Sequence, residues 1–214
     1  MVQVAPSLLS ADFARLGAEV RALDRAGADL IHIDVMDGCF VPNLTFGALV
    51  VKDIRPYTEK PFDVHLMVEK PSGLIPSFCE AGADCLTVHL ECREKIDDLI
   101  AQIKKYGKKV GISIKPHTKV ADVIPYLPMI DRLLVMSVEP GFGGQAFLPQ
   151  ALKKIAELKA LIGHKKVEVS VDGGINDITA PACVLAGADI LVAGSYVFHA
   201  ASYQKAIATL KGAK

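Results

Sequence analysis

Short apolar segments alternate with longer amphipathic segments along the whole chain. The apolar segments are four to six residues long and rich in Val, Ile and Leu, which is typical of buried strands. Eight segments are expected to be strands: 3–7, 30–35, 62–67, 85–89, 110–115, 133–137, 167–172 and 190–193. A helix-like segment follows each of them, most clearly at 149–162, where apolar residues recur at helical spacing. This alternation predicts βαβ units and a parallel sheet.

A short repeat supports this interpretation. Ala-Gly-Ala-Asp occurs three times, at 26–29, 81–84 and 186–189, each time just before an expected strand. Glycine can end a helix there in the left-handed conformation, and the alanines allow a tight turn. Eight βα units in 214 residues favour a single catalytic domain, residues 1–214, folded as a closed (β/α)₈ or TIM barrel. A doubly wound open sheet is the alternative, but no glycine fingerprint follows the first strand.

The charge balance gives no reason to expect a polyelectrolyte partner. Lys and Arg number 24, as do Asp and Glu, so we expect neither a nucleic-acid nor a membrane partner. The five cysteines lack metal-binding spacing, and neither a signal-like segment nor a long apolar run occurs. We therefore expect free thiols and a cytoplasmic protein. The sequence permits a homo-oligomer without requiring one.

Polar residues occupy one face of three expected strands. Because side chains alternate along a strand, His32 shares a face with Asp34, and Asp63 shares one with His65. Asp172 ends the polar face of segment 167–172 in the same way. In a barrel this face points inward, and its last residues reach the C-terminal rim, where sites are built. We therefore expect His32, Asp34, His65 and Asp172 to converge.

Two imidazoles and two carboxylates can bind one divalent metal ion. Their atoms suit zinc, iron(II), manganese or cobalt without selecting among them. Plainer roles are expected for other polar residues nearby. His89 is interpreted as a hydrogen-bonded structural group and Asp37 as a turn residue. Asp63 and Glu168 are expected to pair with Lys115 or another cation.

Glycine-rich segments follow the last three expected strands. They contain Gly141, Gly143 and Gly144, then Gly173 and Gly174, then Gly194 with Ser195. Glycine lets backbone N–H groups approach an anion, and barrels commonly bind phosphate after the seventh and eighth strands. These segments predict a phosphate site. Phe142 gives the longest loop an apolar tip, which suggests a lid.

Taken together, these segments resemble the ribulose-phosphate 3-epimerase family of the pentose phosphate pathway. The resemblance runs along nearly the whole chain, through segments 6–13, 32–38, 40–43, 63–68, 141–145 and 171–174. It implies a metal-dependent isomerase acting on a small sugar phosphate. By position it implies that His32, Asp34, His65 and Asp172 bind the metal, and that the two aspartates also move protons.

The resemblance also implies residues that contact the substrate or its phosphate. They are Ser7, His65, Gly141, Phe142, Gly143, Gly144, Asp172, Gly173, Gly174, Gly194 and Ser195. Met36, Met67 and Met136 match sulfur side chains near the reacting carbon, although adaptable core packing would explain them equally well. Cys39, His117 and Lys119 depart from the commonest family pattern without touching the expected ligands.

The implied reaction interconverts D-ribulose 5-phosphate and D-xylulose 5-phosphate through an enediolate. Asp34 is expected to act as base and Asp172 as acid, from opposite sides of the substrate. The nearest rival is a 3-epimerase of a six-carbon ketose phosphate such as allulose 6-phosphate. A lyase of the hexulose-phosphate synthase type would need lysine where Met36 stands. A barrel that only binds phosphate would leave the His/Asp cluster idle.

Overall fold

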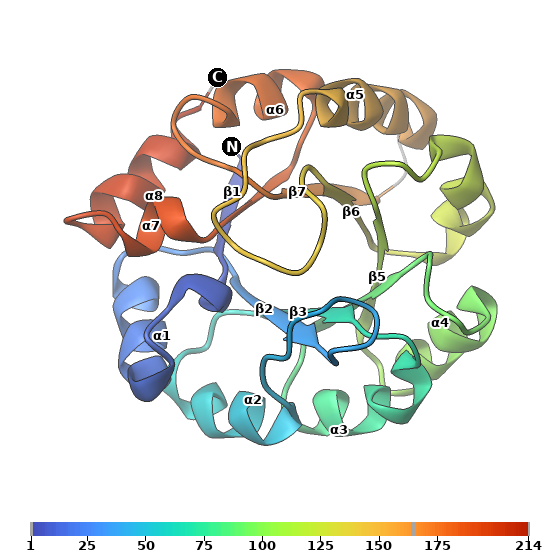
Figure 1. Cartoon of the computed structure of the whole chain (residues 1–214), viewed down its shortest axis with the longest axis horizontal. Coiled ribbons are helices and arrows are strands. Elements are labelled where there is room, and N and C mark those ends of the chain that lie inside the picture. Colours follow the sequence, from blue (N-terminus) through green and yellow to red (C-terminus); the bar gives the residue numbers. More distant parts are fainter. Residues whose placement is uncertain (1, 164–165, 214) are drawn as a thin grey trace.

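Eight parallel strands form a barrel surrounded by helices (Figure 1). This computed structural model describes residues 2–163 and 166–213. The expected domain, residues 1–214, also includes Met1, residues 164–165 and Lys214, which lie outside the described residues. The strands follow the order β1-β8-β7-β6-β5-β4-β3-β2, and a parallel bridge between Ser7 and His32 joins the two end strands. The closed barrel is therefore confirmed and the open sheet is excluded.

The strands lie within one residue of the predicted ranges. They are β1 (Gln3–Pro6), β2 (Ile31–Met36), β3 (Phe62–Met67), β4 (Cys85–His89), β5 (Lys109–Ile114), β6 (Arg132–Met136), β7 (Glu168–Asp172) and β8 (Ile190–Ala193). The start of β6 differs from its predicted position by one residue. The strand begins at Arg132, whose buried side chain pairs with Asp63 and Glu168 inside the barrel.

Helical segments follow each strand, as predicted. The α-helices are α1 (Leu16–Arg25), α2 (Ala48–Ile54), α3 (Ile75–Glu80), α4 (Ile96–Lys105), α5 (Gln150–Ile162), α6 (Ala180–Ala186), α7 (Ser195–Phe198) and α8 (Tyr203–Lys211). Shorter 3₁₀ turns are η1 (Leu8–Ser10), η2 (Phe13–Arg15), η3 (Arg55–Tyr57) and η4 (Pro71–Gly73). No helix in the described ranges is both long and apolar enough to cross a membrane.

The segment after β5 differs from the others. It is a 3₁₀ element, η5 (Val120–Met129), with Pro125 and Pro128 inside it. Proline lacks the N–H group that an α-helix needs in its interior and clashes with the preceding turn. The segment therefore buries Val120, Val123 and Leu127 without forming an α-helix.

The large core lies between the strands and the helices. Apolar strand residues such as Ile31, Ile33 and Val64 face the helices and are fully buried. The alternate residues point into the barrel, where His32, His65 and Ser170 are also fully buried. Buried polar groups are usually hydrogen-bonded. His32 and His65 pair with neighbouring side chains, whereas Ser170 Oγ has no hydrogen-bond partner among the described residues.

The Ala-Gly-Ala-Asp repeat is a strand clamp as well as a turn. Its glycines have positive φ angles of 88°, 105° and 108°, which confirms the left-handed turn. The aspartates Asp29, Asp84 and Asp189 each accept a hydrogen bond of 2.8 Å from a backbone N–H of the preceding strand. Asp131 makes the same bond to Val110, without the repeat sequence. Each clamp thus joins β1, β3, β5 or β7 to the turn that opens the next strand.

Candidate metal centre and substrate pocket

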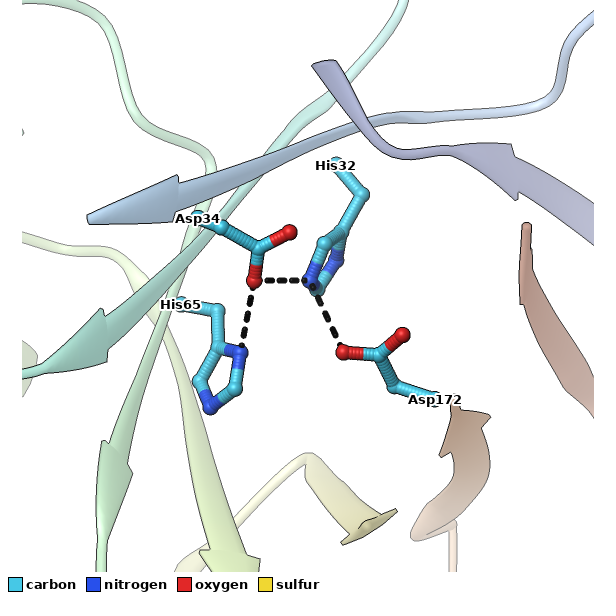
Figure 2. Close-up of side chains that lie close together, drawn as sticks. All are labelled: His32, Asp34, His65 and Asp172. Atoms are coloured by element: carbon cyan, nitrogen blue, oxygen red, sulfur yellow. Dashed lines mark hydrogen bonds and ion pairs between the residues drawn. The ribbon is translucent and has the colours of Figure 1, made fainter. Parts of the chain in front are cut away.

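Four side chains from three strands converge at the C-terminal end of the barrel (Figure 2). His32 and Asp34 come from β2, His65 from β3 and Asp172 from the end of β7. One N or O atom from each lies within 4.8 Å of the others, a grouping that could hold a metal ion. The strand alternation therefore brings together the four residues that it predicted.

Asp34 lies at the centre of this cluster. Its Oδ1 is 3.0 Å from His65 Nδ1 and 3.3 Å from His32 Nε2, while Asp172 Oδ2 is 4.0 Å from His32 Nε2. Ser7 Oγ donates a hydrogen bond of 2.5 Å to the second oxygen of Asp34. The histidine side chains are fully buried, whereas 17% of the Asp172 side chain is exposed. The histidine side of the cluster is thus shielded from solvent, and the cluster is accessible to solvent at Asp172.

Asp63 and Arg132, below the cluster, determine which nitrogen of His32 carries a proton. Its Nδ1 lies 2.9 Å from Asp63 Oδ2, and Arg132 holds Asp63 at 2.7 Å. Because Asp63 accepts the Nδ1 proton, Nε2 of His32 points towards Asp34 and carries the lone pair in the neutral imidazole. Nε2 is buried with no hydrogen-bond partner among the described residues. A buried lone pair beside carboxylates calls for a cation, so the four residues fit a divalent metal.

The pKa of His32 leads to the same conclusion. Burial alone would lower it, but the charges of Asp34 and Asp63 and their hydrogen bonds hold it well above its ordinary value. Without a metal, the cluster therefore retains positive charge as a proton on His32. The binding of a metal ion would displace that proton.

The two aspartates of the cluster have opposite pKa shifts. Burial would raise the pKa of Asp34, but His32 and His65 outweigh it and hold the pKa far below its usual range. Burial and the neighbouring charge of Asp34 raise the pKa of Asp172 to about 6. Two carboxylates this close cannot ionise independently, so Asp34 stays ionised while Asp172 retains a proton more readily.

His65 continues the network on the side away from Asp34. Its Nε2 lies 2.9 Å from Nε2 of the buried His89, whose Nδ1 lies 3.0 Å from Glu91 Oε2. Burial lowers the pKa of His89 to about 4. Hydrogen bonds from His89 and Thr118 overcome the effect of burial and lower the pKa of Glu91 to about 2. His89 is thus neutral and hydrogen-bonded at neutral pH, as expected, and Glu91 is ionised.

A pocket opens onto the aspartates. Its lining includes eleven of the predicted residues: Ser7, Asp34, Gly141, Phe142, Gly143, Gly144, Asp172, Gly173, Gly174, Gly194 and Ser195. Met36, Met67 and Met136 line it too. His32 and His65 are not among the lining residues, so substrate contact by His65 stays a prediction.

Close backbone approaches shape one side of this pocket. Gly174 has a φ of +65°, and a Cβ there would lie 2.6 Å from the backbone N of Phe147. A Cβ on Gly194 would lie 2.6 Å from Ser10 Oγ. No lining residue in the described part of the chain is Lys or Arg, so an anion here would depend on backbone N–H groups and hydroxyls.

Ser10 is a pocket residue that the sequence analysis did not single out. It lies three residues after Ser7: Ser7 caps the start of the 3₁₀ turn η1, and Ser10 is its last residue. Because residues three apart eclipse in a 3₁₀ turn, the two hydroxyls share one side. This spacing is the signal that could have identified Ser10.

The loop after β6 crosses the open end of the barrel and appears yellow in Figure 1. The side-chain amide of Asn43 donates to the carbonyl of Gly141 at 3.0 Å. That of Gln145 donates to the carbonyls of Glu139 and Phe142. Phe142 lines the pocket and is 56% exposed. The loop is therefore anchored at several points with its apolar tip at the pocket mouth.

The structural roles expected for Asp37, Asp63, Glu168 and the cysteines are also confirmed. Asp37 accepts hydrogen bonds from the backbone of Cys39, Phe40 and Glu69, as a turn residue does. Asp63 and Glu168 both pair with Arg132, which is the other cation in place of Lys115. The five cysteines are free, and Cys39 is exposed.

Comparison with known proteins shows close relatives over the full chain. The model of the ribulose-phosphate 3-epimerase family matches residues 3–198. A Bacillus subtilis protein named ribulose-phosphate 3-epimerase is 48% identical over 217 residues, covering 100% of both chains. A chloroplastic ribulose-5-phosphate-3-epimerase of Arabidopsis thaliana is 46% identical, covering 99% of this chain and 76% of its own.

Solved structures with much lower identity share the fold. A 3-hexulose-6-phosphate synthase from Salmonella typhimurium has a TM-score of 0.71 at 21% identity, covering 98% of this chain and 96% of its own. A mutant tryptophan synthase α-subunit from Pyrococcus furiosus has a TM-score of 0.73 at 14% identity, covering 98% of both chains. At these identities the likeness establishes the barrel architecture alone.

Proposed function

Because this chain belongs to the ribulose-phosphate 3-epimerase family and is thus an isomerase, we propose that it interconverts D-ribulose 5-phosphate and D-xylulose 5-phosphate. One observation carries the proposal beyond the family. Two carboxylates with opposite pKa shifts, Asp34 and Asp172, line one pocket from separate strands. Inversion at a carbon needs one group to remove a proton and another to deliver one to the opposite face.

Asp34 acts as the base in the forward direction. It is ionised, and its hydrogen bond from Ser7 and its contact with His65 fix the orientation of the carboxylate. It takes the C3 proton from ribulose 5-phosphate and leaves a planar enediolate. Asp172, whose pKa is raised to about 6, then delivers its proton to the other face of C3.

The roles exchange in the reverse direction. After one turnover Asp34 is protonated and Asp172 is ionised, which is the starting state for converting xylulose 5-phosphate back. Protons must therefore pass between the two carboxylates before the next forward turnover. In their shared cluster the ionised form of one carboxylate raises the pKa of the other, and its protonation lowers that pKa, which suits this exchange.

His32, Asp34, His65 and Asp172 would hold a divalent metal beside the reacting carbons. When bound, such an ion would draw negative charge from the C2 and C3 oxygens as the enediolate forms. His32 and His65 would contribute neutral nitrogen ligands to that ion below the pocket, where both side chains are buried. The two aspartates therefore combine ligation with proton transfer.

The remaining pocket residues bind and orient the substrate. Gly173, Gly174, Gly194 and Ser195 hold the phosphate through the backbone and a hydroxyl, because no cationic side chain lines the pocket in the described residues. Gly141, Phe142, Gly143 and Gly144 close over the sugar and exclude water. Ser7 orients groups near C3, and the three methionines provide an apolar surface for the planar enediolate. His65, buried beside Asp34, orients that carboxylate.

The test is exchange at C3 in heavy water. Purified protein is incubated with ribulose 5-phosphate, and the C3 proton is followed by NMR with and without a strong chelator. We expect deuterium at C3 together with xylulose 5-phosphate, and the loss of both on chelation. Exchange with allulose 6-phosphate but not with ribulose 5-phosphate would assign the six-carbon activity instead. A folded, metal-loaded protein that exchanges neither sugar would contradict an epimerase function.

A further inference from the structure

A chain of hydrogen bonds leads away from the cluster through His65. Nδ1 of His65 lies 3.0 Å from Asp34 Oδ1, and its Nε2 lies 2.9 Å from Nε2 of His89. Nδ1 of His89 in turn lies 3.0 Å from Glu91 Oε2. Both imidazoles are fully buried. No step of the proposed reaction uses His89 or Glu91, so the buried extension needs its own explanation.

Glu91 determines the direction of these hydrogen bonds. An ionised carboxylate can only accept, so His89 carries its proton on Nδ1 and presents the lone pair of Nε2 to His65. His65 must then carry its proton on Nε2. The relay therefore leaves Nδ1, which faces Asp34 and the cluster, as the nitrogen whose lone pair a metal ion can take in the neutral imidazole.

The opposite direction would block the ligand position. If His89 carried its proton on Nε2, it would donate to His65 Nε2. His65 would then hold its own proton on Nδ1, at the place where a metal would bind. Glu91, the acceptor at the far end of the His65–His89–Glu91 hydrogen-bond relay, therefore decides which nitrogen of His65 is free to bind the metal.

Glu91 is itself fixed by the loop after β5. Its Oε1 accepts hydrogen bonds from the backbone N–H of Lys115, at 2.8 Å, and from the hydroxyl of Thr118. Lys154 on α5 holds this loop, because its Nζ donates to the carbonyls of Lys115, Pro116 and Thr118 at 2.7–3.0 Å. The carboxylate thus has little freedom to turn away from His89.

We propose that His89 and Glu91 are positioning residues that hold His65 in the Nε2–H tautomer and keep its Nδ1 available to the metal. This inference rests on the proposed function only in requiring that the cluster bind a divalent ion. The arrangement parallels the other histidine ligand, because Asp63 accepts from Nδ1 of His32 and directs Nε2 to the cluster. Each imidazole would therefore have its tautomer set by a buried acceptor outside the cluster.

The test is cobalt(II) binding, measured by visible absorption on metal-free protein. In Glu91→Gln, the new amide can donate to His89 Nδ1 and reverse the relay, so we expect the Kd to rise by about 10- to 100-fold. His89→Leu removes the acceptor and should weaken binding similarly. His89→Gln keeps an acceptor and a donor, and should stay closer to the wild type. The matched control is Glu94→Gln, on the same loop, which loses bonds to Ser72 but has no link to His65.

A second measurement needs no variant. In zinc-loaded wild-type protein, long-range ¹H–¹⁵N spectra should show the His65 proton on Nε2 and the zinc-induced shift at Nδ1. Zinc at Nε2, an equal cobalt Kd in all variants, or no cobalt binding by the wild type would each overturn the inference. Turnover of ribulose 5-phosphate by the wild type is measured separately, so the failure of one proposal is distinguishable from the failure of the other.

Discussion

At the residue scale, the opposite pKa shifts of Asp34 and Asp172 separate the roles of two chemically identical groups. We expect Asp34→Asn and Asp172→Asn each to abolish net epimerisation without unfolding the protein, because inversion needs both faces of C3. Circular dichroism and metal content should accompany the assay. Asp122→Asn, at an exposed position, serves as the matched control.

Isotope exchange makes this prediction sharper. Asp172→Asn keeps the base for ribulose 5-phosphate, so slow deuterium exchange at C3 should persist there without xylulose 5-phosphate forming. Asp34→Asn should exchange only xylulose 5-phosphate. Near-normal epimerisation by either variant would contradict the two-aspartate assignment.

His89 predicts a pH dependence of stability. Its pKa is about 4 in the folded protein, mainly because of burial, against about 6.5 in an unfolded chain. Between these values the unfolded chain binds a proton that the folded protein does not, so the free energy of unfolding falls as the pH falls. From pH 7 to 5 the contribution of His89 should be a loss of about 2 kcal/mol. Urea unfolding of metal-free protein should show a smaller loss for His89→Gln, and an equal loss would contradict the prediction.

The sequence predicted the cluster because strand alternation and the shared C-terminal rim suffice to place His32, Asp34, His65 and Asp172 together. It did not identify Arg132 as the partner of Asp63 and Glu168. That pairing depends on the register of β6 against β7 and on the layers inside the barrel, which local spacing does not encode. The His89–Glu91 relay was missed for the same reason, since His89 and His65 lie on different strands.

At the element scale, α5 and the loop after β5 are coupled by one lysine. Lys154 donates to three carbonyls of that loop, and the Lys115 amide is bonded to Glu91. Loss of hydrogen bonds from a charged donor should cost about 1–3 kcal/mol. We therefore expect Lys154→Met to speed hydrogen exchange at the Lys115 amide by at least about tenfold. Lys153→Met, at the exposed neighbouring position, should leave this amide unchanged.

Helices and strands could be predicted where the burial of apolar side chains alone determines them. The eight strands carry continuous apolar faces against the helices, so their ranges could be read within one residue. The segment Val120–Met129 kept its apolar pattern but not an α-helix, because Pro125 and Pro128 interrupt it. The second role of the Ala-Gly-Ala-Asp repeat could not be predicted, since the backbone N–H that donates to its aspartate is known only when two strands lie side by side.

At the scale of the whole molecule, the cluster links metal binding to stability. An ion that binds only the folded protein raises the free energy of unfolding by about 2.7 kcal/mol at 100 times its Kd. We expect the free energy of unfolding, measured by urea unfolding, to be higher by this amount for protein with cobalt(II) than for protein in chelator. His65→Asn, which lacks one ligand, should gain less at the same cobalt(II) concentration. An equal gain by both proteins would place the stabilising ion elsewhere.

The aspartate clamps have a consequence for cutting the chain in two. A break at Gly107, between α4 and β5, leaves the clamps at Asp29 and Asp84 in one fragment and those at Asp131 and Asp189 in the other. A break at Gly82 instead separates Asp84 from Phe62. Fragments from the first break should therefore reassociate more tightly when mixed, as calorimetry would measure. Three metal ligands would lie in one fragment and Asp172 in the other, so added cobalt(II) should strengthen the association of the two halves of the barrel.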